Sequence, residues 1–362
     1  MDAAALRAEF PIFERLAYLN AGTCGPLPAA ALRATGEALE IAATQGRAHA
    51  YFTRTIDSRT RLRAAYAGVL GAQPDDVALT TSTSEGIVRV LAALDLRPGD
   101  EVLTSDEEHP GVNGPLTGAR ALRGIALRVV PFAQLADAVD EHTKLVACSH
   151  VSWISGRLAP DFSGLGVPVL LDGAQGVGAV PVDVARLGCA FYAGSGQKWL
   201  CGPVGTGMLW VSPAWNARLP APGPTYMNLA EAGTGLDAVP HANAARHDAS
   251  AQSLEATIAA VAALEILAGP SLDAVYDRAA SLASTLATAL EECGRRVAPR
   301  DRTTLVSWED PDPAATRLRL AEVGVVVRDL PGTGLLRASV GAWNDDTDLD
   351  RLLAALDAGR AR

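Results

Sequence analysis

The sequence has few of the features that mark secreted, membrane-spanning or metal-binding proteins. Its 362 residues include five cysteines at scattered positions with no C-x-x-C pair, so neither a disulfide framework nor a cysteine zinc site is indicated. The six histidines show no metal-ligand spacing. No run of about 18 apolar residues occurs that could span a membrane, and the amino terminus lacks the apolar core of a signal peptide. We therefore expect a cytoplasmic protein without a metal site.

Basic residues are also in deficit. The chain has 31 Lys and Arg against 41 Asp and Glu, and its net charge of −10 disfavours a nucleic acid or an anionic membrane as a partner. Hydrophobic residues at 49% and charged residues at 20% are typical of a globular protein. A chain of this length can bury a large core and form two domains. A small molecule is the expected ligand.

Short apolar segments alternate with Ala/Leu-rich helical stretches between residues 60 and 212. This alternation predicts an α/β fold with a mostly parallel seven-stranded sheet. Its strands are expected at Asp76–Thr81, Glu101–Ser105, Leu127–Phe132, Lys144–Ser149, Pro168–Leu171, Ala190–Ala193 and Gly207–Val211. In such sheets ligands bind at the carboxyl ends of the strands.

The remainder of the chain predicts a smaller C-terminal α/β domain. Its helices and strands are expected at Leu254–Leu267, Leu272–Glu292, Thr304–Ser307, Gly324–Arg328, Gly334–Ser339 and Asp346–Ala358. We assign residues 17–250 to a large cofactor-binding domain and 251–362 to the small domain, with residues 1–16 packing on the small one.

A lysine and a carboxylate form the most informative pair in the sequence. Asp172 ends the apolar run Pro168–Leu171, and Lys198 lies in the segment Ser195-Gly196-Gln197-Lys198-Trp199. Pyridoxal 5′-phosphate (PLP) needs a lysine for its aldehyde and an acid opposite its ring nitrogen. A buried carboxylate also needs a cationic partner, which a pyridinium supplies. Burial and a neighbouring cation would lower the pKa of Lys198 and present a neutral amine.

Other polar residues follow neighbouring strands. The run Ser82–Gly86 opens a helix, where hydroxyls and free N–H groups can bind a phosphate, although an ordinary N-cap with a capping glutamate is the plainer alternative. His109 lies past Glu101–Ser105, where an imidazole could stack on a flat ring or serve only as a loop residue. Gln175, three residues after Asp172, could donate to a cofactor oxygen or merely satisfy its loop.

These motifs resemble the class V (cysteine desulfurase-like) branch of the fold-type I PLP-dependent enzymes. The resemblance runs from Tyr18-Leu19-Asn20-Ala21-Gly22 to near Leu356, and its most specific motifs surround Asp172 and Lys198. It implies that Lys198 forms the Schiff base with the cofactor, that Asp172 pairs with the pyridine nitrogen, and that His109 stacks on the ring. It further implies contacts to the cofactor's phenolate and phosphate and to the substrate from Gln175, Thr83, Ser84, Ser195, Arg337, Asn20 and Trp153. Arg337 would grip the substrate carboxylate with its planar guanidinium. The family also implies a homodimer.

Two positions depart from the family pattern. Gln197 stands where relatives have a phosphate-contacting histidine, and its amide can still donate one hydrogen bond. Ala251 stands where relatives have a threonine that reaches the phosphate of the neighbouring subunit, and the adjacent Ser250 is a possible replacement.

The departures also bear on the reaction. A cysteine desulfurase needs a thiol shortly before the substrate arginine, but the stretch from Val327 to Gly334 contains no cysteine. Cys24 lies in a segment that reaches the active site in relatives and is a marginal replacement. Trp153 occupies the position of a substrate-contacting asparagine in desulfurases, and the cysteine/cystine C–S lyases carry such a tryptophan. Among the subfamilies, the chain is most similar to these lyases.

The resemblance therefore implies β-elimination from a cysteine-derived amino acid, such as cysteine, cystine or an S-conjugate. Lys198 would remove the α-proton, and the products would be pyruvate, ammonia and a thiol or persulfide. An isopenicillin N epimerase-like epimerase and an aminotransferase are alternatives on the same scaffold. A non-catalytic binding protein is a more remote one, suggested by Gln197 and Ala251 and opposed by the presence of Lys198, Asp172, His109 and Arg337.

Overall fold

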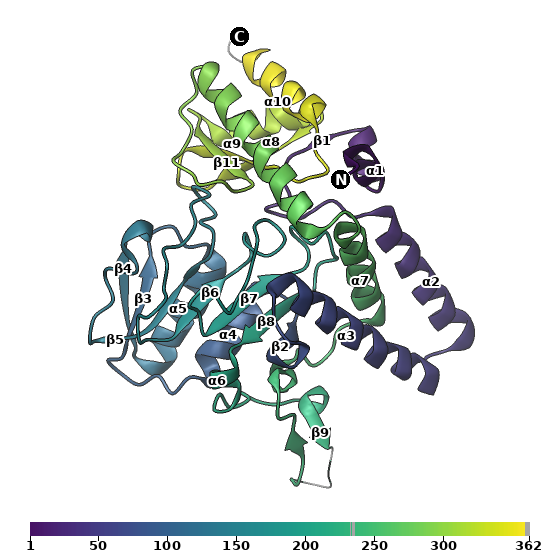
Figure 1. The fold of residues 1–362 in the computed structure, drawn as a ribbon, viewed down its shortest axis with the longest axis vertical. Coiled ribbons are helices and arrows are strands. Elements are labelled where there is room, and N and C mark those ends of the chain that lie inside the picture. The colour runs from purple at the N-terminus through teal and green to yellow at the C-terminus, as the bar shows by residue number, and fades with distance from the viewer. Residues whose placement is uncertain (232, 234–235, 359–362) are drawn as a thin grey trace.

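A seven-stranded sheet is the central element of the computed structural model, which describes residues 1–231, 233 and 236–358 (Figure 1). In spatial order its strands are β2 (Val77–Thr80), β8 (Gly207–Val211), β7 (Phe191–Ser195), β6 (Val169–Asp172), β5 (Thr143–Ser149), β3 (Glu101–Ser105) and β4 (Ala126–Val130). β8 is antiparallel to both of its neighbours, and the other pairings are parallel. The predicted sheet is confirmed, and each strand lies within two residues of its expected bounds.

Helices cover both faces of this sheet, with α4 and α5 on one face and α3 and α7 on the other; their bounds are Thr83–Ala93, Pro110–Arg123, His49–Leu70 and Leu254–Ala268. Successive strand residues alternate between the faces. Within β2, Ala78 belongs to the cluster that contains Ile87 of α4, whereas Leu79 belongs to the cluster that contains Leu62 of α3. Burial on both faces explains why the strands read as continuous apolar runs.

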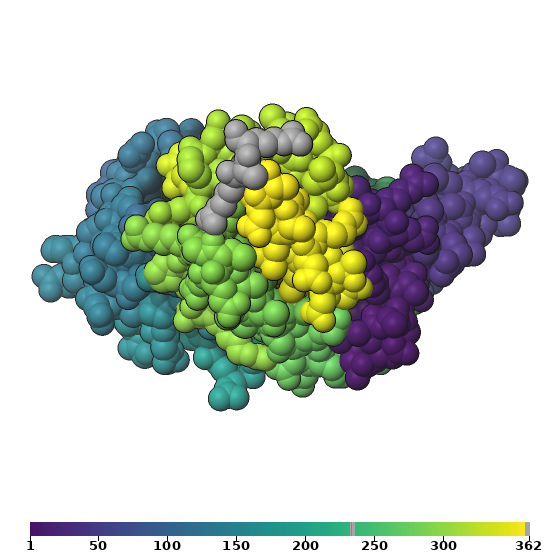
Figure 2. Space-filling model, turned by 90° about the horizontal axis from the view of Figure 1, so that it is seen from above, coloured from purple at the N-terminus to yellow at the C-terminus, as the bar shows by residue number. Residues whose placement is uncertain are grey.

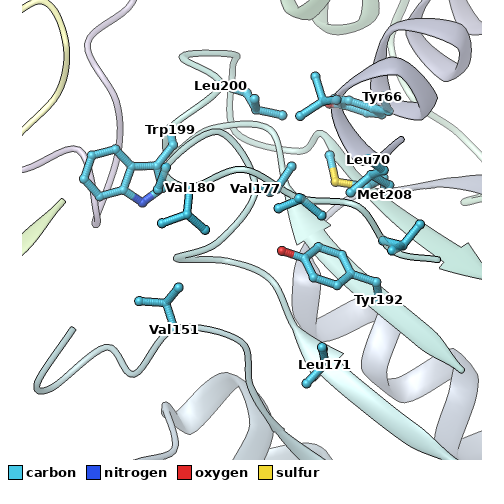
Figure 3. Packing of buried hydrophobic residues seen from close by; sticks show 14 of the residues in the cluster. Tyr66, Leu70, Val151, Leu171, Val177, Val180, Tyr192, Trp199, Leu200 and Met208 are labelled. Atoms are coloured by element: carbon cyan, nitrogen blue, oxygen red, sulfur yellow. The ribbon is translucent and has the colours of Figure 1, made fainter. Parts of the chain in front are cut away.

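The residue after Lys198 anchors the segment that carries it. Trp199 is 1% exposed, and Figure 3 shows its indole on the same apolar layer as Tyr192, with Val177 and Val180 between them. The Trp199 indole N–H donates to Oε1 of Gln175 at 3.0 Å, so the ring is held by a polar contact as well as by packing.

The small domain contains a three-stranded antiparallel sheet of order β11-β14-β13, with bounds Leu305–Glu309, Leu335–Ser339 and Arg328–Leu330. Its helices are α8 (Leu272–Glu292), α9 (Pro313–Glu322) and α10 (Asp346–Ala358). The single strand expected at Gly324–Arg328 is wrong. The segment divides at Val327 into β12 (Val325–Val326) and β13, because β12 pairs with β1 (Ala17–Tyr18) and β13 pairs with β14.

The amino-terminal residues contact the small domain. The helix α1 (Ala3–Ala8) and the turn η1 (Pro11–Glu14) precede β1, and Arg7 forms ion pairs with Asp345 and Asp348. Figure 2 shows the purple amino-terminal segment beside the yellow carboxyl-terminal helix. The division into 17–250 and 251–362 stays a proposal, and residues 359–362 lie outside the described part of the chain.

Two long helices that the sequence did not predict extend from the body of the protein (Figure 1). They are α2 (Ala29–Gln45) and α3, and both contact α7. The remaining short elements are η2 (Pro74–Asp76), η3 (Phe132–Gln134), α6 (Pro213–Asn216), η4 (Tyr226–Asn228), β9 (Leu229–Glu231), β10 (Val239–Pro240) and η5 (Ala244–His247). Among the described residues no single helix is long and apolar enough to cross a membrane, whereas α7 and α8 pass that test only as a pair bent by 77°.

A buried ion cluster joins α3 to the edge of the sheet. The Asp248 carboxylate accepts from Nη2 of Arg59 at 2.7 Å and from both terminal nitrogens of Arg63 at 3.0 and 2.7 Å. It also accepts from the Leu79 N–H at 2.8 Å. One carboxylate therefore accepts hydrogen bonds from three guanidinium nitrogens and one backbone N–H.

We expect Asp248→Asn to lower the free energy of unfolding by about 3 kcal/mol or more, because it leaves two arginines in a buried site without a counter-charge. Urea denaturation at neutral pH measures the change. Glu265→Gln, which breaks an exposed ion pair with Arg61, is the matched control and should cost under about 1 kcal/mol. Equal effects of the two substitutions would contradict this account.

Candidate active site

The carboxyl ends of the parallel strands bring the predicted site residues to one edge of the sheet. The carboxyl ends of β2, β3, β5, β6 and β7, and the segments that follow them, supply Thr83, Ser84, His109, Trp153, Asp172, Gln175, Ser195, Gln197 and Lys198. Arg337 enters from β14 of the small domain, and Asn20 from the segment after β1. The site is thus assembled from both halves of the chain.

Lys198 and Asp172 lie within electrostatic range of each other. Burial lowers the pKa of Lys198 to about 8, with a further decrease from Arg337, while the Asp172 charge acts in the opposite direction. Burial raises the pKa of Asp172, and the Lys198 cation and the Ala174 N–H, which donates to Asp172 Oδ1 at 2.8 Å, oppose that rise. A substantial fraction of Lys198 is therefore neutral slightly above neutral pH, as a nucleophilic amine requires.

Some polar groups at the start of α4 cap the helix, and others have no hydrogen-bond partner in the protein. Ser82 Oγ accepts from the Glu85 N–H at 3.1 Å, and Glu85 Oε2 accepts from the N–H and hydroxyl of Thr81, both at 2.6 Å. Ser82 and Glu85 thus satisfy the capping alternative. The buried hydroxyl of Thr83 has no partner, as is true of the buried Ser195 hydroxyl across the site.

His109 is held as a neutral imidazole. Its Nδ1 accepts from the Gly111 N–H at 2.9 Å, which leaves the ring proton on Nε2. Burial, with Lys198, Arg328 and Arg337, lowers the pKa of His109 to about 4. The indole of Trp153 packs edge-on against the imidazole with ring centroids 4.9 Å apart.

The amino-terminal segment closes over the lysine loop. Gln175 Nε2 donates to the Gly22 carbonyl at 2.8 Å, so both ends of the amide have protein partners, and its predicted contact with the cofactor stays a prediction. The Gly25 N–H donates to the Gln197 carbonyl at 2.8 Å. A Cβ added at Gly25 would lie 2.0 Å from the Lys198 carbonyl oxygen, so this close approach requires glycine.

Two arginines face each other across the small-domain sheet. Arg337 is 1% exposed and is paired in register with Arg328 of β13. Arg337 Nη1 donates to the Trp153 carbonyl at 2.7 Å, and Arg328 Nη1 donates to Thr23 Oγ1 at 3.2 Å. The same hydroxyl donates to Oδ1 of Asn20 at 2.8 Å, so Asn20 orders this turn.

These guanidinium groups have no anionic partner among the described residues. Neither Arg337 nor Arg328 forms an ion pair with any carboxylate in the described ranges, and the buried Arg337 Nε has no partner. Burial, followed by the Arg328 charge, lowers the pKa of Arg337 to about 9, so Arg337 stays cationic at neutral pH. Arg328 is a site residue that sequence reasoning missed, because only the pairing of β13 with β14 reveals that it faces Arg337.

Two acids beside His109 were also missed. Glu107 Oε2 accepts from the hydroxyls of Ser152 and Ser155, which flank Trp153. Glu108 is buried and accepts from side chains of β3 and β5. Consecutive acids at a strand end were the available signal, since a carboxylate there must be either solvated or paired.

These residues fit a phosphate-bearing pyridine cofactor. The unpartnered buried hydroxyls of Thr83 and Ser195 are donors of the kind that a phosphate needs. The buried Gln197 Oε1 is also unpartnered, and rotation of the amide would put its NH₂ group there. Asp172 offers the buried carboxylate that a ring N–H requires.

Comparison with known proteins agrees with this geometry. The aminotransferase class-V family model matches residues 17–352, and the chain belongs to this family. It is 32% identical to a probable cysteine desulfurase of Pseudomonas aeruginosa, over 97% of this chain and 96% of the relative. It is 29% identical to isopenicillin N epimerase of Streptomyces clavuligerus, over 59% of this chain and 56% of that protein.

Solved structures of the lyase C-DES have the same fold. A lysine-to-alanine variant of C-DES with glycine covalently linked to its PLP cofactor matches with a TM-score of 0.88, 26% identity and coverage of 97% of this chain and 98% of that one. The complex of the cystine C–S lyase C-DES with its reaction product cysteine persulfide matches with a TM-score of 0.87, 26% identity and coverage of 96% and 98%. The chain is therefore a PLP-dependent enzyme in the cysteine desulfurase and C–S lyase group, as the sequence motifs predict.

The electrostatics of Lys198 can be measured during cofactor capture. The rate at which cofactor-free protein binds PLP covalently should rise with pH and be half-maximal near pH 8, because only the neutral amine attacks the aldehyde. Asp172→Asn should move this midpoint to lower pH and Arg337→Gln to higher pH, since the first charge raises and the second lowers the lysine pKa. Stopped-flow absorbance gives the rates. A midpoint near 10.5, the ordinary lysine value, would contradict the assignment.

Proposed function

We propose that the enzyme cleaves the C–S bond of a cysteine-derived amino acid by β-elimination and releases pyruvate, ammonia and a thiol or persulfide. The observation that carries this proposal is the combination of a Lys198 amine with a lowered pKa, the cationic pair Arg337 and Arg328, and a β13–β14 turn without a cysteine. A base and a carboxylate anchor are sufficient for elimination, whereas persulfide transfer needs an enzyme thiol.

Each proposed role follows from a position in the site. Bound PLP supplies an electron sink for the carbon next to the amino group. Asp172 holds the proton on the ring nitrogen, and the hydroxyls of Thr83 and Ser195 bind the phosphate, with Ser84 and Gln197 beside them. His109 would stack on the ring, and Gln175 would contact its phenolic oxygen. Once free, the Lys198 amine would remove the α-proton.

Substrate recognition is proposed for the opposite wall of the site. Arg337 binds the α-carboxylate, because its guanidinium is charged, buried and without a protein anion. Arg328 adds a second cation nearby, which favours substrates with a further acidic group, such as cystine. Trp153, whose indole N–H is unpartnered, and Asn20 complete this wall.

The thiols of the chain favour elimination over persulfide transfer. Burial raises the pKa of Cys148, Cys189 and Cys201, so these three groups are poor nucleophiles. Cys293 lies at the end of α8 in the small domain. Cys24 is half-buried and lies within electrostatic range of Lys198, which makes it the one thiol that a competing persulfide route could use.

The proposal is tested by incubating the yellow holoenzyme with cystine and with a cysteine S-conjugate, and assaying pyruvate and released thiol or persulfide together. We expect the two products in equal amounts, with loss of both in Lys198→Ala. Cys24→Ser should retain the activity, because no enzyme thiol takes part. Sulfur release without pyruvate, abolished by Cys24→Ser, would instead establish a desulfurase.

Two arginine variants separate recognition from chemistry. Arg337→Lys should raise KM by about tenfold or more with a smaller effect on kcat, because lysine loses the bidentate grip. Arg328→Lys should affect cystine more than cysteine. If neither pyruvate nor thiol forms while amino acids still change the absorption spectrum, the epimerase or aminotransferase alternative, favoured by the similarity to isopenicillin N epimerase, replaces the lyase. An absorption spectrum that amino acids do not change would indicate a non-catalytic binding protein.

We also propose that the enzyme is a cytoplasmic homodimer. Its five cysteines are all free, which suits a reducing compartment. Large apolar side chains on α2 and α3 are more than half exposed, as expected for a surface that a second subunit covers; they are Leu32, Leu39, Phe52 and Ile56. Ser250 is half-buried and follows Ala249, whose N–H donates to the Leu79 carbonyl of β2, and it stays a candidate for the cross-subunit phosphate contact.

Sedimentation of the wild type should give a dimer at micromolar concentration. A Phe52→Glu/Ile56→Glu double variant should sediment as a monomer, because burying two carboxylates in an apolar interface is unfavourable. Leu122→Glu changes a leucine on α5 that is more exposed than either residue, and it should leave the dimer intact. A monomeric wild type would contradict the proposal.

A further inference from the structure

Glu108 is a buried carboxyl group between two strands of the cofactor site. It is 5% exposed, and its Oε1 lies 2.5 Å from Ser105 Oγ at the end of β3. Its Oε2 accepts from the N–H and the hydroxyl of Ser149, at the end of β5, at 2.8 and 2.6 Å. The residue that follows it, His109, caps α5. Glu108 therefore links the β3 and β5 ends to the imidazole.

Glu108 is the neighbour of Asp172 but lacks the cation that Asp172 has. Ser149, which donates to Glu108, is paired in register with Asp172, so the Glu108 carboxyl group lies beside the strand that carries Asp172. Asp172 faces Lys198, whereas Glu108 forms no ion pair with any Lys or Arg of the described residues. Ionisable groups near Glu108 include the thiol of Cys148 and the imidazoles of His109 and His150, all uncharged at neutral pH. The adjacent acid, Glu107, accepts instead from Ser152 and Ser155.

The difference in partners decides which of the two acids ionises. Burial raises the pKa of Glu108 to about 7; the hydroxyls of Ser105 and Ser149 oppose this rise, and the charge of Asp172 adds to it. Two adjacent buried acids with one nearby cation hold one proton between them most readily on the acid that is farther from the cation. In this site that acid is Glu108.

We propose that Glu108 is a positioning residue that works in its protonated form, holding His109 and the β3 and β5 ends in place while leaving Asp172 as the single anion opposite the cofactor's ring nitrogen. An ionised Glu108 accepts from the Ser105 hydroxyl at Oε1. In the proposed protonated form this hydrogen bond is reversed: the proton lies on Oε1 and is donated to Ser105 Oγ, which also accepts from the Glu107 N–H at 3.2 Å. Oε2 keeps both donors from Ser149. The inference rests on the proposed role of Asp172 and is independent of which amino acid the enzyme cleaves.

A glutamine at this position reproduces the protonated form. Its amide oxygen can accept from the Ser149 N–H and hydroxyl, and its NH₂ group can donate to Ser105 Oγ. Glu108→Gln therefore preserves every hydrogen bond of a neutral Glu108, while Glu108→Ala removes them and leaves the Ser149 N–H unpaired. If the working form were ionised, both substitutions would disturb the site.

Infrared spectroscopy of the holoenzyme tests the protonation state without turnover. At a pH of about 6, below the pKa of about 7, the wild type should show the C=O stretch of a protonated carboxylic acid that Glu108→Gln lacks. The band should persist in Glu107→Gln, which removes the adjacent acid bound by Ser152 and Ser155. It should disappear from the wild type as pH rises to about 9.

Cofactor binding tests the positioning role. Glu108→Gln should change the dissociation constant for PLP by less than about threefold and should not shift the cofactor's absorption maximum. Glu108→Ala should weaken PLP binding by about tenfold or more. Equal weakening in both variants, or a wild type without the infrared band, overturns the proposal. Because neither readout uses catalysis, an inactive result in the lyase assay leaves this test unaffected.

Discussion

The excess of buried positive charge at one edge of the sheet is the constraint on which the rest of the site depends. Lys198, Arg337 and Arg328 lie within range of one another, and Asp172 is the charged carboxylate opposed to them. Such an arrangement is costly in a low dielectric unless anions enter. A phosphate-bearing cofactor and an amino-acid carboxylate supply those anions, so ligand binding and charge neutralisation are the same event.

The site that holds this charge is built from segments that lie far apart in the sequence. The strand ends of the large domain provide the lysine and the acid, β14 provides Arg337, and the turn at Gly22 to Gly25 closes over both. A Cβ at Gly22 would lie 2.9 Å from Arg337 Nη2 and 2.9 Å from Gln175 Oε1, so that glycine joins the two walls by close backbone approach. Glu108, in its proposed protonated form, then joins the ends of β3 and β5 next to His109 without adding a second anion.

Local sequence was sufficient to predict the strands and the residues that end them. Buried strands read as short apolar runs, and polar residues at their ends or shortly after them could be assigned to the sheet edge, as for Asp172 and Lys198. The position of Arg328 could not be predicted in this way, because it depends on the register between β13 and β14 and on the break at Val327. The helices α2 and α3 were missed because exposed apolar residues such as Leu39 and Ile56 blur the amphipathic pattern.

The same electrostatics couple substrate binding to the strength of the base. In the free enzyme Arg337 and Arg328 both lower the pKa of Lys198, which favours the neutral amine needed to hold the cofactor. In the proposed mechanism, a substrate carboxylate bound to these guanidinium groups would neutralise that influence, and the pKa of the lysine would then rise toward its ordinary value. Lys198 would thus become a stronger base when its amine is free and an α-proton must be removed. An amine substrate without a carboxylate would leave the charges of Arg337 and Arg328 uncompensated, and the pKa of Lys198 would stay low. Carboxylate recognition and proton abstraction would therefore be linked through charge as well as through position.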